Sequence, residues 1–260
     1  MAVAPNEDSD TGVCAERSIP RKTRGAAETR GSDNMKAVLF LVALAVAAPA
    51  AAQTATQPRV WMEVSVQGRV GSDSPWRWAA DSLVRTRNGA STVDFMGEWF
   101  SVKRDLTQRS AVGIGYAFVA GFPDDGLSRE HRFVQQYTWR ADLAGRVSVR
   151  TQLEERFVSG DNGMAVRVRE RFRSTWPLEP RETLRAVVWD EVFVKVNSPA
   201  RTTRGFDSNQ LFVGIGHKVT GRSSVEIGYL NVYSPGAPSR ARYSHVMAAT
   251  LVMSLSEVSK

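Results

Sequence analysis

Arginine occupies every second position from residue 167 to residue 173, and mostly apolar residues fill the positions between. A period of two is that of a β-strand, whose side chains point alternately to its two faces. Four guanidinium groups on one face cannot be buried without partners, so that face meets water or carboxylates. Glu154 and Glu191 lie in the alternating segments on either side, which predicts cross-strand ion pairs if the three segments are neighbouring strands. The predicted charge network comprises Glu154, Arg167, Arg169, Arg171, Glu191 and Lys195.

This predicted network has two interpretations. Paired charges can fill and close a narrow barrel lumen, or a surplus of arginine can form a basic channel for anions. Two acidic residues do not fit the pattern, because Glu170 and Asp190 fall on the apolar face and would need a β-bulge or local water. We favour the structural, occluded lumen and keep a narrow anion-selective pore as the alternative.

Residues suited to catalysis or metal binding are few. The histidines His131, His217 and His245 all lie on predicted strands or at their ends. Ser244 and His245 are adjacent, so on a strand they point to opposite faces and cannot act as nucleophile and base. We predict no catalytic residues and keep a membrane-interface hydrolase only as a further alternative. The acid–glycine segments at residues 124–126 and 161–163 are typical of turns, so we expect no metal and no cofactor.

The elements that must position these residues are strands. From residue 60 to residue 255 the chain consists of about eleven alternating segments separated by turn signals such as Asn88-Gly89, and none resembles a helix. Long strands with aromatic ends match a tilted bilayer crossing, which favours an all-β, antiparallel up-and-down transmembrane β-barrel. Bacterial single-chain barrels have even strand numbers, so we expect about 10 to 12 strands and an even count. The alternative is a soluble periplasmic β-sandwich that acts as a binding protein.

Aromatic residues and glycines refine this expectation. The aromatic residues assigned to the two girdles of the barrel are Trp61, Trp76, Trp99, Trp139, Trp176, Tyr233 and Tyr243. Four glycines within strands are predicted to allow close packing or bending of the barrel wall, and these are Gly113, Gly115, Gly214 and Gly216.

The amino-terminal part of the chain predicts export. Residues 35–52 have a lysine, an apolar run and a small-residue end, which is the pattern of a signal peptide cleaved after Ala52. Residues 1–34 have the composition of a disordered or non-native extension, and residues 53–260 form the expected barrel domain. The first 52 residues carry six basic and six acidic side chains, so the remainder keeps the net charge of +7. We expect an outer-membrane monomer in contact with lipid, without nucleic acid.

Several segments also carry a family resemblance. They are RVRERFR at 167–173, WDEVF at 189–193, GFDSNQLFVGIG at 205–216, EHRFVQQY at 130–137 and a closing strand with His245. With these, the chain resembles the bacterial domain of unknown function 2490 family of outer-membrane barrel proteins. The resemblance covers nearly all of residues 53–260, implies an exported barrel and supplies no activity. The end of the chain, SLSEVSK, departs from barrels in general because it lacks a terminal aromatic residue.

Overall fold

The fold is taken from a computed structural model of the 260-residue chain. It describes residues 59–71, 73–124, 126–143, 145–199, 203–235 and 242–255. The expected extension at residues 1–34 and the expected signal peptide at residues 35–52 lie outside the described residues. No helix in the described residues is long and apolar enough to cross a membrane.

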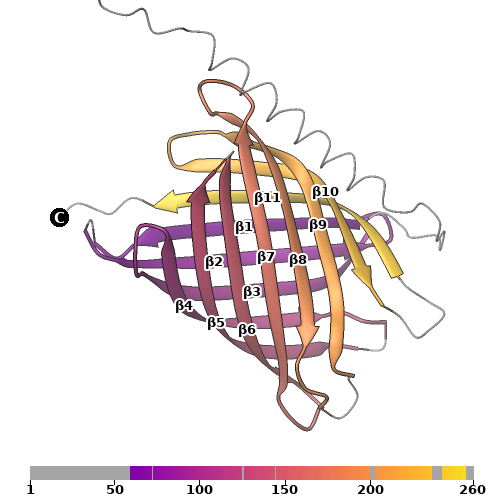
Figure 1. Cartoon of the computed structure of the whole chain (residues 1–260). Coiled ribbons are helices and arrows are strands. Elements are labelled where there is room, and N and C mark those ends of the chain that lie inside the picture. The colour runs from indigo at the N-terminus through magenta and orange to yellow at the C-terminus, as the bar shows by residue number, and fades with distance from the viewer. Residues whose placement is uncertain are drawn as a thin grey trace, which may run out of the picture. The chain divides into compact units, whose positions relative to one another are not determined.

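The described chain forms a closed barrel of eleven strands. In chain order the strands are β1 (Arg59–Arg69), β2 (Trp76–Arg87), β3 (Thr92–Asp105), β4 (Ser110–Gly121), β5 (Ser128–Asp142), β6 (Arg146–Val158), β7 (Ala165–Pro177), β8 (Leu184–Lys195), β9 (Gly205–Lys218), β10 (Ser223–Ser234) and β11 (Arg242–Leu255). Figure 1 shows two walls, in which the strands around β7 to β9 run steeply across those from β1 to β3. The predicted all-β barrel is confirmed.

The expectation of an even strand number is wrong, and so is that of a wholly antiparallel sheet. Each strand pairs antiparallel with the next, but β1 and β11 close the barrel as a parallel pair, with Arg59 opposite Val246 and Gly68 opposite Leu255. The reason is geometric. Strand direction alternates along an up-and-down chain, so the first and eleventh strands run the same way and can pair only in parallel.

Strand register follows the alternation of the sequence, with two interruptions. The pairing shifts between Arg85 and Thr86 on β2, and again between Phe193 and Val194 on β8. The Asn88-Gly89 pair lies in the predicted hairpin turn between β2 and β3 and takes positive φ angles of 54° and 67°. Asparagine and glycine adopt this left-handed conformation more readily than other residues, which explains the turn.

Large apolar side chains cover the outside of the barrel. Ile114 on β4, Phe172 on β7 and Met247 on β11 expose 68%, 52% and 64% of their surface, and no two of these strands are neighbours. Their neighbours one position along each strand point inward, as the period of two requires. The outer surface is therefore apolar over most of its circumference.

Outward aromatic residues gather near both ends of the strands. At one rim the Tyr233 ring packs against Tyr243 and Phe206, with ring centroids 5.0 and 5.9 Å away. At the other rim Trp76 and Trp139 are exposed. Two residues assigned to the girdles lie elsewhere: Trp61 is buried inside the barrel, and Trp99 faces inward opposite Ala117. These two assignments are corrected, because both tryptophans share the inward parity of their strands.

Candidate functional site: the charge network of the lumen

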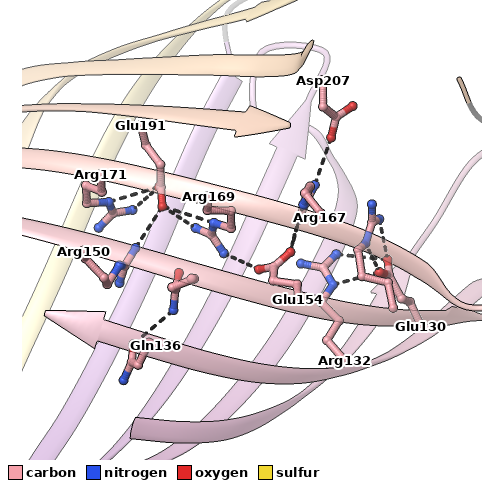
Figure 2. A network of polar contacts seen from close by, with 12 residues as sticks. Glu130, Arg132, Gln136, Arg150, Glu154, Arg167, Arg169, Arg171, Glu191 and Asp207 are labelled. Carbon is pink, nitrogen blue, oxygen red and sulfur yellow. Dashed lines mark hydrogen bonds and ion pairs between the residues drawn. The ribbon is translucent and has the colours of Figure 1, made fainter. Parts of the chain in front are cut away.

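Glu191 on β8 is the centre of the ion-pair network inside the barrel. Its carboxylate is fully buried and accepts hydrogen bonds from three arginines (Figure 2). Arg171 donates from Nε and Nη2 at 3.0 and 2.6 Å, and Arg169 and Arg150 approach to 3.0 Å. Arg171 lies directly opposite Glu191 in the β7–β8 register, whereas Arg150 reaches it from β6, one strand further away. One carboxylate thus joins three strands.

Glu154 on β6 is the second fully buried carboxylate. Arg167, its direct partner in the β6–β7 register, donates to one oxygen at 2.6 and 2.8 Å. Arg169 donates to the other oxygen at 2.6 Å. Since Arg169 also contacts Glu191, its guanidinium links the two buried acids (Figure 2). Charge-assisted bonds of this kind are short and directional, so they hold the strands in one register.

Further ion pairs lie toward one end of the lumen. Glu130 on β5 binds Arg132 at 2.9 Å and also pairs with Arg156. Asp207 on β9 lies 2.8 Å from Lys195 and 3.2 Å from Arg167. A separate cluster, at the other end of the same wall, joins Glu226 to Arg173 and Arg185. Glu130, Arg132 and Arg156 form a group of their own. The part connected through Glu154, Glu191 and Asp207 contains five cations and three carboxylates, so its net charge is positive.

Another part of the lumen wall is apolar. A cluster of buried side chains from β1 and β8 to β11 packs together inside the barrel, and its members are Trp61, Val187, Phe212, Leu230 and Val246. Gly214 and Gly228 lie opposite each other beneath the Phe212 ring, and a Cβ at either position would come within 2.7 Å of it. This agrees with the prediction that strand glycines allow close packing. Charged and apolar side chains therefore both line the interior.

All six residues of the charge network predicted from the sequence have side chains that point into the barrel. Glu154, Glu191 and the three arginines are in direct contact, and Lys195 joins through Asp207. The sequence reasoning did not identify Glu130 and Asp207 as partners. Glu130 shares its parity with the inward Arg132, which was a usable signal. Asp207 lies beside the register shift at Phe193 and Val194, which alternation cannot reveal.

Glu170 and Asp190, the two acids that broke the predicted pattern, face outward. The register of β7 and β8 is regular at both positions, so the expected bulge is absent from this pair of strands. Each carboxylate instead accepts a hydrogen bond from a polar side chain of an adjacent strand. Thr151 on β6 donates to Glu170 and Asn209 on β9 donates to Asp190, both at 2.7 Å. Neighbouring polar groups therefore satisfy part of their hydrogen-bonding capacity.

The three histidines lie on the outer face, away from the network. His131 pairs with the hydroxyl of Tyr116 at 2.6 Å, and His245 pairs with that of Tyr229. Ser244 has the inward parity and His245 the outward one, as alternation requires. Among the described residues, His, Asp and Glu form no cluster of three or more that could hold a metal ion.

The fold and interior define a closed eleven-stranded barrel with an ion-paired lumen. Comparison with known proteins places the chain: residues 58–242 match the model of the family described as protein of unknown function DUF2490. The chain is also 30% identical over 217 residues to an uncharacterized protein of Methylorubrum extorquens, covering 81% of this chain and 93% of that relative. The chain belongs to the DUF2490 family, as its sequence segments predicted. Neither match names an activity.

Proposed function

We propose that this protein is an outer-membrane β-barrel with a closed lumen and a structural role, and that it performs neither transport nor catalysis. The observation that carries the proposal is the distribution of side chains. Carboxylates such as Glu154 and Glu191 are buried inside, while residues such as Ile114 and Met247 are exposed outside. A water-soluble barrel would expose the first set and bury the second.

Strand dimensions support the same proposal. The strands contain 11 to 15 residues, enough to cross a bilayer at the tilt of membrane barrels. Outward aromatic residues lie near both rims, the position of interfacial girdles in such proteins. On this proposal the barrel contacts lipid directly as a monomer, since closure leaves no strand edge for a second copy to pair with.

The closed lumen is supported by burial. Glu154 and Glu191 have no exposed surface, and the apolar cluster around Leu230 is also closed to water. Arginine side chains span the space beside them, as expected where a narrow barrel is filled by its own side chains. The surplus of cations favours a second candidate, a narrow anion-selective pore, because a positive bore attracts anions.

Two experiments test these proposals. Recovery in the outer-membrane fraction, with a gel mobility that shifts on boiling, is expected of a membrane barrel. Recovery as a soluble periplasmic monomer would contradict it. In planar bilayers the purified protein should give no steady current. A steady anion-selective current that is lost when Arg167, Arg169 and Arg171 are substituted would establish the pore in place of the closed lumen.

A further inference from the structure

A cavity of about 280 Å³, called here the rim cavity, lies at the rim that carries the β3–β4 and β5–β6 turns. Residues of the β3–β4 turn and of β5, β6 and β7 line it, and the ionisable ones are Arg109, Arg140, Asp142, Arg146 and Arg173. Four arginines against one carboxylate favour an anionic ligand. Pockets for small molecules begin at about 300 Å³, so the rim cavity suits a group of headgroup size.

Strand register brings two of these arginines to the same level of the wall. Arg140 on β5 lies opposite Ser148 on β6, and Ser148 lies opposite Arg173 on β7. Arg140 has the inward parity of β5, which it shares with the buried Arg132. Neighbouring strands are about 4.8 Å apart, so the backbones of the two arginines stand roughly 10 Å apart with the serine between them.

The β3–β4 turn places Arg109 beside this row. Its carbonyl oxygen accepts a hydrogen bond from the backbone N–H of Arg140 at 2.8 Å. Thr107 holds the turn, because its hydroxyl oxygen accepts bonds from the N–H groups of Arg109 and Ser110 at 3.1 and 3.0 Å. The Arg109 side chain is exposed and makes no hydrogen bond or ion pair with any residue that the structure describes. Its guanidinium is therefore available to a ligand in the rim cavity.

The arginines of the rim cavity share their carboxylates with other arginines. Asp105 lies 3.9 Å from Arg140, too far for a hydrogen bond, and it also pairs with two arginines of β1 and β2. Glu226 accepts bonds from Arg173 and from an arginine of β8. The cavity and the ion pairs linked to it hold seven arginines and four carboxylates, which are Arg69, Arg77, Arg109, Arg140, Arg146, Arg173, Arg185, Asp105, Asp142, Glu182 and Glu226.

A second cavity, of about 270 Å³, adjoins the first and differs from it in charge. It shares Asp142 and Arg146 with the rim cavity and adds Glu182 and Arg185. Two arginines and two carboxylates line it, so its charges balance. The excess positive charge therefore belongs to the rim cavity.

We propose that the rim cavity binds a phosphate group. A guanidinium presents a planar fork of N–H donors that matches two phosphate oxygens, and the Ser148 hydroxyl adds a donor between the forks of Arg140 and Arg173. Arg173 keeps donors for this contact, because its Nη2 alone bonds Glu226. A lipid headgroup and a soluble phosphate offer the same chemistry to this site. The proposal goes beyond the structural role and does not depend on whether the lumen is closed.

Calorimetric titration of the purified barrel tests the proposal, in neutral detergent at fixed ionic strength. The two probes are sodium phosphate and dihexanoyl phosphatidic acid, and one saturable site per barrel is expected. Arg109→Gln and Arg140→Gln should each weaken binding at least about tenfold, because each removes charge-assisted hydrogen bonds. Their thermal unfolding midpoints should stay nearly unchanged, since both side chains are exposed.

Arg222→Gln is the matched control. Arg222 has the place of Arg109 in the β9–β10 turn, where Thr220 accepts bonds from the N–H groups of Arg222 and Ser223 at 3.1 and 3.0 Å, but it does not line the rim cavity. Binding of sodium phosphate would show that a soluble phosphate suffices, and binding of the lipid alone would identify a headgroup site. No binding of either probe, binding that the two cavity variants do not weaken, or equal weakening by the control would overturn the proposal.

Discussion

Replacement of Glu191 by glutamine tests whether the charge network holds the barrel together. The change keeps the shape of the side chain and removes its charge. In the native barrel this carboxylate is fully buried and receives hydrogen bonds from Arg150, Arg169 and Arg171. In the variant one carboxylate oxygen becomes an amide that donates, so it faces guanidinium groups that also only donate. The three arginines keep their mutual repulsion and lose their shared counter-charge.

The expected cost follows from burial. Breaking a buried ion pair by removing one partner typically costs about 3–5 kcal/mol, because a charge is left uncompensated. An exposed pair contributes at most about 1 kcal/mol. The contrast is available within this protein, since Arg146 and Glu182 pair at 2.7 Å with 66% and 53% of their side chains exposed. We therefore expect Glu191→Gln to lower the free energy of unfolding by about 3 kcal/mol or more, and Glu182→Gln to have little effect.

Urea unfolding of the barrel in detergent micelles, followed by tryptophan fluorescence, measures both changes. A second variant that also replaces Arg169 by glutamine should recover part of the loss, because it removes one of the stranded cations. Equal stability of Glu191→Gln and Glu182→Gln would show that water screens the lumen. The reasoning from a dry network would then be refuted.

Further predictions concern the outer face and the barrel wall. If the outer face meets lipid as proposed, Glu170→Leu should raise the free energy of unfolding by about 1 kcal/mol in lipid vesicles, because a carboxylate in lipid is costly even when Thr151 bonds it. A loss of stability would indicate that this face meets water. Gly228→Ala should destabilise the barrel by roughly 1–3 kcal/mol, since the new methyl group would lie 2.3 Å from the Val213 carbonyl oxygen. Gly221→Ala, where nothing lies within 4 Å, should be neutral, and equal midpoints for the two alanine variants in thermal unfolding would contradict the close packing at Gly228.

The alternation of side chains along the strands predicted the central network. Its two buried glutamates fall on the same face of the sheet as the arginines of the neighbouring strand. The sequence predicted ion pairs between these acids and the arginines, and the strand register places Glu154 opposite Arg167 and Glu191 opposite Arg171. Trp61 was wrongly assigned to an aromatic girdle because it lies near a strand end. Its side chain is on the same face of β1 as the polar residues of that strand. Residue type alone does not distinguish an interfacial tryptophan from one that packs inside.

The features that escaped prediction depend on long-range geometry. Asp207 enters the lumen next to a register shift, and one extra residue in a strand moves its neighbours between faces. The odd strand number escaped because a general rule for bacterial barrels was preferred to the direct count of alternating segments. The burial of the network could not be read from the sequence either. It depends on how closely the two walls approach, which local patterns do not encode.

The parallel pairing of β1 with β11 has a consequence for chain topology. Because the two strands run in the same direction, the chain enters the barrel at Arg59 on one rim and leaves it after Leu255 on the other. A barrel with an even number of crossings returns the chain to the side from which it started. If this one spans a bilayer, epitope tags attached before β1 and after β11 would lie in different compartments. A protease added from outside intact cells would then remove one tag and leave the other.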